Sequence, residues 1–522
     1  MRCALAALCL LLLAACGERD TGKTGAGPGG GPLRILAGSE IRDLEPLRAG
    51  MERAAGAHIE LVYSGSLDAV EKLEAGEPYD AVWLSHGKYL QQTPSLRPKI
   101  RASERIMTSP VVLGLKASKA AALGWDRGDP TWADIVRAAA SGKLSYGMTN
   151  PASSNTGFTA LVGVAAALAD KQDAITVADI KSDELRKLFQ GQKLTAGSSG
   201  WLAEAFLRDQ DRIDGLINYE SVILELQAGG KLKEPLVPIY PREGIVTADY
   251  PLMLLNESKR GSYDRLVKYL RSPATQKEIT QRTLRRPVLP EVEPAAAIPK
   301  KVLSELPFPA SREVLDELID AYQGELRRPA STYFVIDTSG SMKGEGISQL
   351  RAALHALAGA DASISGRFAR FQPRERIYLL PFSHVPGQAR RYELPRRGEP
   401  APALEQVRAF ADALQADGGT AIFSSVKTAL EAAVADRRRA ADRAYSVVVM
   451  TDGRNESGMG EREFERWYLE LPQEARGIPV YGLLFGQAEK AQLEHIAQLS
   501  GGRVFDARKN LAVAFKEIRG YQ

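Results

Sequence analysis

Residues 333–341 read Tyr333-Phe334-Val335-Ile336-Asp337-Thr338-Ser339-Gly340-Ser341, a large apolar run followed at once by a carboxylate and hydroxyls. A short continuous apolar run of this kind is typical of a strand buried on both faces of a parallel sheet. In open α/β sheets, ligands bind outside the carboxyl ends of such strands. The stretch therefore predicts an α/β domain whose ligand site begins at Asp337.

Two further segments supply oxygen atoms in the order that such a site needs. Asp417-Gly418-Gly419-Thr420 is a flexible turn ahead of a helical pattern, and Thr420 adds a hydroxyl. Val447-Val448-Val449-Met450-Thr451-Asp452 is a second apolar run that ends in an acid. If both apolar runs are strands of one parallel sheet, Asp337 and Asp452 lie on the same edge. The alternative is that each segment is only a turn or a helix cap, since Ser and Asp are common capping residues.

The succession Asp337-Thr338-Ser339-Gly340-Ser341, Gly418-Gly419-Thr420 and Thr451-Asp452-Gly453 resembles the metal-ion-dependent adhesion site of von Willebrand A (VWA) domains, over about residues 330–522. The resemblance implies that Ser339 and Ser341 ligate a metal directly, and Thr420, Asp337 and Asp452 directly or through water. Mg²⁺ suits such hard oxygen ligands, with Mn²⁺ and Ca²⁺ as alternatives. It also implies a protein partner whose carboxylate fills the open position on the metal.

The C-terminal region alternates between strand-like and helical patterns, as a doubly wound, Rossmann-like domain does, and we place this domain at 328–522. We expect strands at 333–336, 377–380, 445–450 and 480–485 and helices around 347–357 and at 511–518. The first helix carries Ile347, Leu350, Leu354 and Leu357 on one face, the apolar stripe of a core-facing helix.

Residues 33–296 also alternate between apolar runs and helical periodicity, which favours α/β units with a mostly parallel sheet. Their length favours two lobes that share crossover strands. We expect strands at 33–36, 59–63, 81–84, 111–115, 146–148, 216–219, 237–240 and 251–255, and helices at 159–169 and 263–271.

Several motifs in this half resemble bacterial type II periplasmic solute-binding proteins: Ala37-Gly38-Ser39, Tyr63-Ser64-Gly65-Ser66, Tyr79-Asp80-Ala81-Val82-Trp83, residues 149–157 and Ala248-Asp249-Tyr250-Pro251. The resemblance implies a two-lobed fold with a cleft. We expect the cleft residues to be Ser39, Ser66, Asp80, Ser153, Ser154, Asn155 and Thr156. Turns before helices offer free backbone N–H groups, which suit anions or carboxylate-bearing solutes. The alternatives are that these residues only cap helices, or that the cleft has lost its ligand and serves as a scaffold.

The segments before and after residues 33–296 also have recognisable sequence patterns. Arg2, an apolar run from Ala4 to Leu13 and the sequence Leu13-Ala14-Ala15-Cys16 resemble a bacterial lipoprotein signal. We expect a signal peptide at 1–15, lipidation of Cys16 and a Gly-rich tether at 16–32. At the other end, Pro-rich residues 297–327 predict a linker and one connecting helix, with Val314, Leu315, Leu318 and Ile319 at helical spacing.

Composition excludes several function classes. The 522 residues are 44% hydrophobic and 25% charged with a net charge of +4, so a soluble globular protein is expected and nucleic-acid binding has no support. Cys3 and Cys9 lie in the predicted signal and Cys16 would be acylated, which leaves no disulfide and no thiolate metal site. No two histidines have metal-ligand spacing, His86 is expected at a surface or hinge, and no catalytic motif is present. We expect no enzymatic activity.

The sequence thus predicts a membrane-anchored binding protein, on the outer face of the cell membrane or in the periplasm or outer membrane. Its VWA domain would bind Mg²⁺ and, through it, a protein partner, and its N-terminal domain a small solute or anion. A second hypothesis is the substrate-binding component of an ABC importer with an accessory VWA domain.

Overall fold

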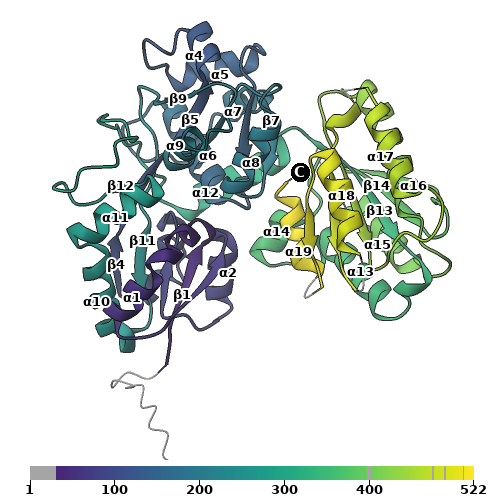
Figure 1. The fold of residues 1–522 in the computed structure, drawn as a ribbon, viewed down its shortest axis with the longest axis horizontal. Helices are drawn as coiled ribbons and strands as arrows, with labels where there is room; N and C mark the ends of the chain where they lie inside the picture. The colour runs from purple at the N-terminus through teal and green to yellow at the C-terminus, as the bar shows by residue number, and fades with distance from the viewer. Residues whose placement is uncertain (1–30, 397–400, 473–474, 487–488, 509–510, 522) are drawn as a thin grey trace, which may run out of the picture.

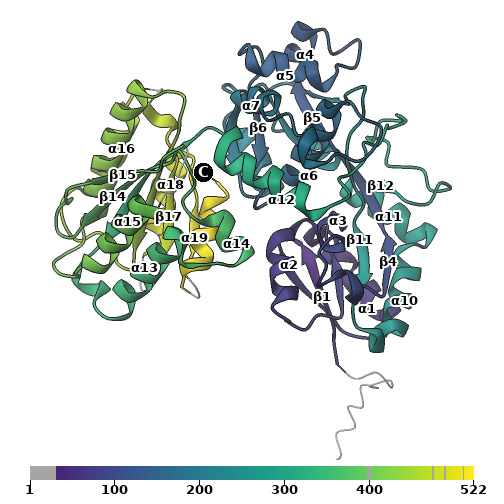
Figure 2. The same cartoon turned by 180° about the vertical axis from the view of Figure 1, so that it is seen from behind.

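The structure is a computed structural model of the chain, and it describes residues 31–396, 401–472, 475–486, 489–508 and 511–521. Figure 1 and the reverse view in Figure 2 show two α/β lobes and a third α/β domain beside them. The predicted signal peptide, Cys16 and the tether up to Gly30 lie outside the described residues. Among the described residues, no helix combines the length and the apolar character needed to cross a membrane.

The first lobe is built on a five-stranded sheet in the order β2-β1-β3-β11-β4. Its strands are β1 (Leu33–Gly38), β2 (Ile59–Ser64), β3 (Ala81–Trp83), β4 (Ala102–Arg105) and β11 (Pro251–Leu254). Its helices are η1 (Ser39–Leu47), α1 (Arg48–Ala55), α2 (Ser66–Glu74), α3 (Lys88–Gln91), η2 (Arg97–Lys99), η4 (Glu257–Lys259), α10 (Arg260–Leu270) and α11 (Pro273–Thr283). The apolar runs at 33–36, 59–63 and 81–84 form the parallel part of this sheet, as predicted.

The second lobe has a sheet in the order β10-β5-β8-β6-β7, with β9 and β12 also paired to β5. Its strands are β5 (Met107–Lys116), β6 (Tyr146–Thr149), β7 (Gln192–Ala196), β8 (Gly215–Tyr219), β9 (Leu236–Ile239), β10 (Thr247–Ala248) and β12 (Arg286–Pro287). Its helices are α4 (Ala117–Leu123), α5 (Trp132–Ala140), α6 (Asn155–Ala169), η3 (Val177–Asp179), α7 (Ser182–Gln190), α8 (Ser199–Arg208) and α9 (Glu220–Ala228).

The expectation of a mostly parallel sheet in this half is wrong. β5 runs antiparallel to β8, β9, β10 and β12, and β11 runs antiparallel to β3 and β4. The chain passes from lobe to lobe at β4–β5 and at β10–β11, separated only by Ile106 and by Asp249 and Tyr250. A strand that carries the chain directly across a hinge needs no crossover helix, so it can pair antiparallel with its neighbours.

The third domain has a six-stranded sheet in the order β15-β14-β13-β16-β17-β18, parallel except at β15. Its strands are β13 (Ala330–Asp337), β14 (Arg376–Phe382), β15 (Arg390–Glu393), β16 (Ala444–Thr451), β17 (Val480–Leu484) and β18 (Val504–Asp506). One face packs on α13 (Glu345–His355), α15 (Ala401–Ala413) and α19 (Leu511–Arg519), and the other on α16 (Ile422–Arg439), α17 (Glu461–Glu470) and α18 (Lys490–Ser500). The predicted doubly wound architecture is therefore confirmed.

The predicted connecting helix is present as α12 (Arg312–Ala321), but it is not a free connector. Val314, Leu315, Leu318 and Ile319 are all buried in the hydrophobic core of the two-lobed domain. The helix begins at an N-cap, where the Ser311 hydroxyl accepts from Val314 N, and continues into a π-helical turn, η5 (Tyr322–Leu326). The apolar stripe of α12 therefore packs against the preceding domain.

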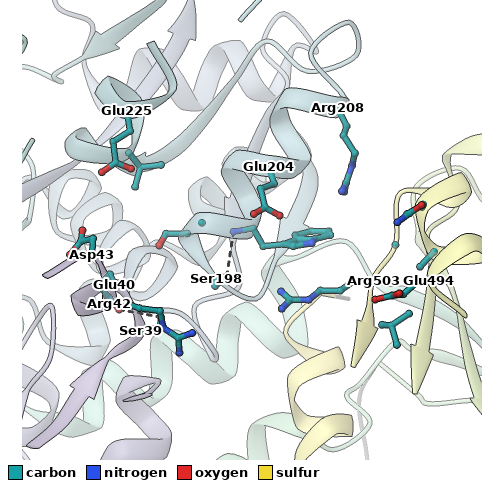
Figure 3. Close-up of a pocket in the computed structure, with 18 of the residues that line it drawn as sticks. Ser39, Glu40, Arg42, Asp43, Ser198, Glu204, Arg208, Glu225, Glu494 and Arg503 are labelled. Atoms are coloured by element: carbon teal, nitrogen blue, oxygen red, sulfur yellow. Dashed lines mark hydrogen bonds between the residues drawn. The ribbon is translucent and has the colours of Figure 1, made fainter. Parts of the chain in front are cut away.

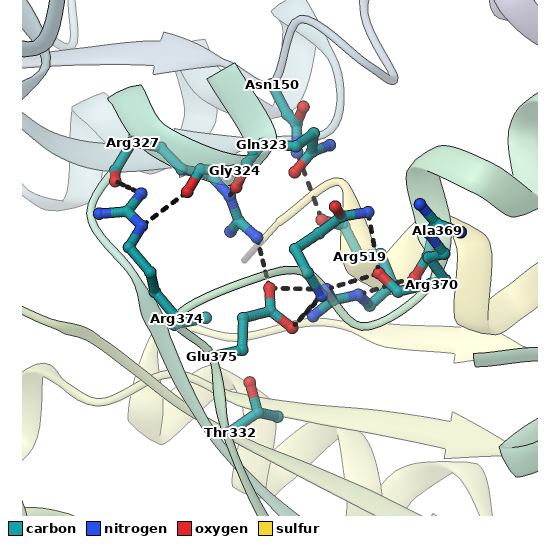
Figure 4. Close-up of polar contacts among 12 residues, drawn as sticks. Asn150, Gln323, Gly324, Arg327, Thr332, Ala369, Arg370, Arg374, Glu375 and Arg519 are labelled. Atoms are coloured by element: carbon teal, nitrogen blue, oxygen red, sulfur yellow. Dashed lines mark hydrogen bonds and ion pairs between the residues drawn. The ribbon is translucent and has the colours of Figure 1, made fainter. Parts of the chain in front are cut away.

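A fully buried carboxylate, Glu375, lies where the chain enters the third domain (Figure 4). Arg519, near the end of α19, donates to both oxygens of Glu375 at 2.7 and 2.8 Å, and Arg327 donates to it as well. Burial would raise the pKa of Glu375, but the charges of Arg519 and Arg327 outweigh burial and lower it. Glu375 is thus ionised at neutral pH and ties the first and last segments of the domain together.

We predict that Glu375→Gln destabilises the protein by about 3–5 kcal/mol, because it removes the buried negative charge with which two buried guanidinium groups pair. The measurement is denaturant unfolding of the full chain at pH 7. The matched control is Glu393→Gln, which removes an exposed partner of Arg376 and Arg391 and should cost at most about 1 kcal/mol. Equal effects of the two substitutions would contradict this account.

Candidate metal centre and interlobe cleft

The carboxyl end of β13 carries the first part of the predicted metal site. Asp337 is fully buried, and its Oδ1 accepts a hydrogen bond from Ser339 N at 2.8 Å. The hydroxyls of Ser339 and Ser341 lie 3.0 Å apart, and Ser341 donates to Asp452 Oδ1 at 2.7 Å. The hydroxyl of Thr451 donates to Asp337 Oδ2, which links the ends of β13 and β16. These groups form one continuous set of oxygen atoms.

The loop that carries Thr420 closes the site from the side. Gly340 N donates to Gly418 O at 2.8 Å, and Gly418 takes a φ of 85°, which favours glycine. A Cβ built on Gly453 would lie 3.6 Å from both Ser341 Oγ and Thr420 Oγ1. The two hydroxyls therefore converge on the space that Gly453 leaves open. The structure brings together all five residues that the sequence singled out.

The electrostatics of the site favour a bound cation. Desolvation by burial raises the pKa of Asp337, although hydrogen bonds from Ser339 and Thr451 lower it, and Asp452 raises it further. Burial likewise raises the pKa of Asp452. Two partly desolvated carboxylates beside neutral hydroxyls are hard oxygen donors that a divalent cation would stabilise. Ser341 is exposed, so the site is open to solvent on one side. The residues present fit a magnesium-type ion.

The residues predicted for the solute cleft lie mostly where the two lobes meet. Ser39 begins η1 and is exposed, and Ser66 begins α2 and is buried. Ser153 and Ser154 precede α6, whose first turn contains the buried Asn155 and Thr156. A Cβ built on Gly65 would lie 3.2 Å from Ser153 O, so the loops of the two lobes touch.

Side-chain hydrogen bonds join the two lobes directly across the cleft. Asn155 Nδ2 donates to Glu40 Oε1 at 3.2 Å, and Tyr219 OH donates to Ser85 Oγ at 3.0 Å. Among the described residues, Ser66 Oγ and Asn155 Oδ1 are buried without a hydrogen-bond partner. Both residues line a small, partly open pocket between the lobes, whose volume of about 10 Å³ is roughly what one water needs. Buried polar atoms of this kind are the feature expected of a ligand or water site.

The expectation that Asp80 contributes to the cleft needs correction. Asp80 precedes β3 and so lies at the amino end of the parallel strands, opposite the cleft. Its Oδ2 accepts from Arg34 N at 2.9 Å, and its Oδ1 accepts from Asn256 Nδ2 at 2.8 Å. Both oxygens serve to join neighbouring chain segments, which is a structural role.

Several cleft residues were not predicted. Arg285 is buried between the lobes, and its Nη1 donates to Asp43 Oδ2 at 2.6 Å. Its guanidinium carbon lies 4.7 Å from the centroid of the Tyr250 ring. His86 was expected at a surface or hinge, but burial lowers its pKa to about 4, and its ring stacks on Phe308 at 4.6 Å. No local pattern marks these residues, because their partners are distant in sequence. Asp249-Tyr250, quoted for the family resemblance, was the only nearby signal.

Comparisons with known proteins agree with this architecture. Residues 33–282 match the family model of bacterial extracellular solute-binding proteins, and residues 332–518 match the von Willebrand factor type A domain. The chain therefore contains one domain of each family, and both are families of binding domains. No curated protein matches the chain.

Solved structures with similar folds include the periplasmic binding protein AfuA from Actinobacillus pleuropneumoniae (15% identity, 56% of this chain and 98% of that one, TM-score 0.44). The ferric binding protein from Campylobacter jejuni is 13% identical over 56% of this chain and 98% of that one, with a TM-score of 0.44. A von Willebrand factor type A structure from Catenulispora acidiphila is 18% identical over 37% of this chain and 42% of that one, with a TM-score of 0.29.

We predict that Mg²⁺ raises the melting temperature of the full chain and that Asp337→Asn removes this gain. A ligand at about 100 times its Kd stabilises a protein by about 2.7 kcal/mol, which thermal unfolding resolves. Without Mg²⁺, Asp337→Asn should melt no lower than the wild type. The raised pKa of Asp337 means that its ionised form is less stable in the folded protein than in the unfolded chain. Above the folded pKa, this charge therefore lowers the free energy of unfolding, and the loss is relieved as the pH falls.

The matched control for this prediction is Asp417→Asn. Asp417 is exposed beside the site, where its carboxylate pairs with Lys343 at 3.5 Å, and it is outside the oxygen set. This variant should keep the full Mg²⁺ response. An equal response in Asp337→Asn and wild type would exclude the metal site.

Proposed function

Because this chain joins a bacterial extracellular solute-binding domain to a von Willebrand factor type A domain, we propose that it is an extracytoplasmic, two-module binding protein. Its VWA domain binds Mg²⁺, and the metal binds a carboxylate of a protein partner. The solute-binding domain contributes a cleft for a small solute or anion. Lipidation of Cys16 holds the whole chain at a membrane surface outside the cytoplasm.

The observation that carries this proposal is the convergence of five oxygen-bearing side chains at the carboxyl ends of β13 and β16. Three of the five are neutral hydroxyls, so a divalent ion held there keeps most of its charge. Such an ion attracts a further anionic ligand from outside, and the exposed Ser341 marks the open side. Asp, Ser and Thr oxygens of this kind hold Mg²⁺ with room for further ligands.

The cleft of the solute-binding domain supports the second part of the proposal. Ser66, Asn155 and Thr149 each hold a buried oxygen without a hydrogen-bond partner among the described residues. A small ligand with hydrogen-bond donors would satisfy these acceptors. Both modules match families of binding domains, so we propose binding rather than catalysis.

We predict that the VWA domain recovers its partner only with Mg²⁺. The full chain is immobilised, incubated with cell-envelope extract of the native organism, and eluted with EDTA. A protein retained by the wild type in Mg²⁺ should be absent with EDTA and from Asp452→Asn, because the metal bridges the two proteins. Asp417→Asn should retain it. Recovery that is the same with Mg²⁺ and EDTA would rule out a metal-bridged partner.

For the cleft, we predict that a thermal-shift screen of oxyanions, metal ions and small carboxylates finds a ligand that stabilises the full chain. Ser66→Ala should weaken the shift, because the Ser66 hydroxyl lies buried at the interlobe pocket. Ser141→Ala, at an exposed hydroxyl on the same domain, is the control. If no compound shifts the melting temperature, the domain is a scaffold.

A further inference from the structure

The last residues of the VWA domain dock on the second lobe. The ring of Tyr521 meets Trp201 edge-on, with centroids 4.7 Å apart and an interplanar angle of 84°. Asn150 Nδ2 donates to the carbonyl of Arg519 at 3.4 Å, which joins the loop after β6 to the end of α19. One hydrophobic cluster also contains buried residues of both the second lobe and the VWA domain. The two units therefore share a core.

Two glycines make this approach possible. A Cβ built on Gly197 would lie 2.5 Å from the ring of Tyr521, and one on Gly520 would lie 2.7 Å from Ser153 Oγ. Real Cβ atoms do not approach other atoms so closely, so any larger residue at Gly197 must displace Tyr521. The second lobe and the VWA domain each therefore contribute a glycine that makes room for a side chain of the other. Ser153 belongs to the loop predicted to line the solute cleft.

The same VWA domain also contacts the first lobe. Its helix α14 (Ile364–Ala369) lies against α2, as both views show (Figures 1 and 2). Phe368 of α14 is buried in the hydrophobic cluster of the solute-binding domain. Helix α19, which carries the end of the domain, packs on α14 in turn. The VWA domain thus touches both lobes at once.

A segment that we call the strap, residues 305–321, bridges the lobes a second time. The ring of Phe308 stacks on His86 of the first lobe, and its centroid lies 6.2 Å from the ring centroid of Phe158 in the second lobe. At its start, Glu305 accepts two hydrogen bonds from Thr247 in β10. At its end, Tyr89 OH donates to Asp316 of α12 at 2.7 Å, and α12 also packs on α6.

A large groove lies where the three units meet (Figure 3). It has a volume of about 880 Å³. Asp43 comes from the first lobe, Glu225 and Arg208 from the second, and Arg503 from the VWA domain. The VWA domain therefore forms one wall of a groove that also includes Glu40, which accepts from Asn155 across the interlobe cleft.

These contacts limit how the lobes can move. If the lobes rotate apart, the VWA domain cannot follow both, so its packing against one lobe breaks, and Phe308 loses one of its two partners. Packed interfaces have discrete arrangements and do not deform continuously. We propose that the docked VWA domain and the strap lock the two lobes in the closed arrangement, and that the cleft opens only when the VWA domain leaves one lobe. Any solute that binds the cleft is then thermodynamically linked to VWA docking.

The test measures the distance between the lobes in the full chain. Spin labels are placed at Arg53→Cys on the first lobe and Lys143→Cys on the second, both exposed, with the three native cysteines replaced by serine. Pulsed electron paramagnetic resonance should show one narrow distance distribution in this parent chain.

Gly197→Val combined with Phe308→Ala should add a second population at longer distance, because one change displaces Tyr521 and the other removes the strap's ring. The matched control is Gly128→Val with Val302→Ala. A Cβ at Gly128 meets nothing within 4 Å, and Val302 is 97% exposed in the segment that leads into the strap. The control should keep the narrow distribution.

Two results would overturn the lock. One is a parent chain that already shows two lobe distances, and the other is a double variant that keeps its circular dichroism spectrum and the narrow distribution. If the double variant fails to fold, the parent-chain measurement still decides, because a lock requires a single closed population there.

Discussion

The parallel, in-register pairing of β13 with β14 and β16 is the constraint on which the candidate metal centre depends. Asp337 lies opposite Phe382, and Ile336 lies opposite Met450, so β13 and β16 end at the same edge. The backbone ladder thereby brings residues more than 110 positions apart, such as Ser341 and Asp452, into hydrogen-bond contact. A shift of one residue in this register would turn each side chain to the other face and separate the acids.

A second constraint, the buried charge cluster at Glu375, holds that sheet in place relative to the rest of the chain. Arg327 comes from the segment that leaves the solute-binding domain, and Arg519 comes from the helix that ends against it. The carbonyl of Arg519 in turn accepts from Asn150 in the cleft loop. One ionised carboxylate thus orders both the entry to the VWA domain and the residues that dock on the second lobe (Figure 4).

The two modules are therefore not independent units on a flexible linker. The predicted linker region ends in α12, whose apolar stripe is buried in the two-lobed core, and the VWA domain shares a hydrophobic cluster with the second lobe. The candidate metal site on one module and the interlobe cleft in the other are parts of one packed body. The contacts around Tyr521 join the VWA domain to the second lobe, and those around Phe308 join the two lobes to each other.

The sequence by itself determined the α/β class and predicted the four central strands of the third domain and the candidate metal set, because apolar runs end directly in Asp337 and Asp452 and local spacing marks Ser339, Ser341 and Thr420. It also placed Ser66 and Asn155 in turns ahead of helices, and in the structure they are the first residues of α2 and α6. The tertiary structure alone decided that Asp80 is structural, that β5 pairs antiparallel, and that Arg285, His86 and Phe308 fill the space between the lobes. Periodicity reports only which face of an element is apolar. Which distant surface covers that face depends on packing between segments hundreds of residues apart, and no local pattern encodes it.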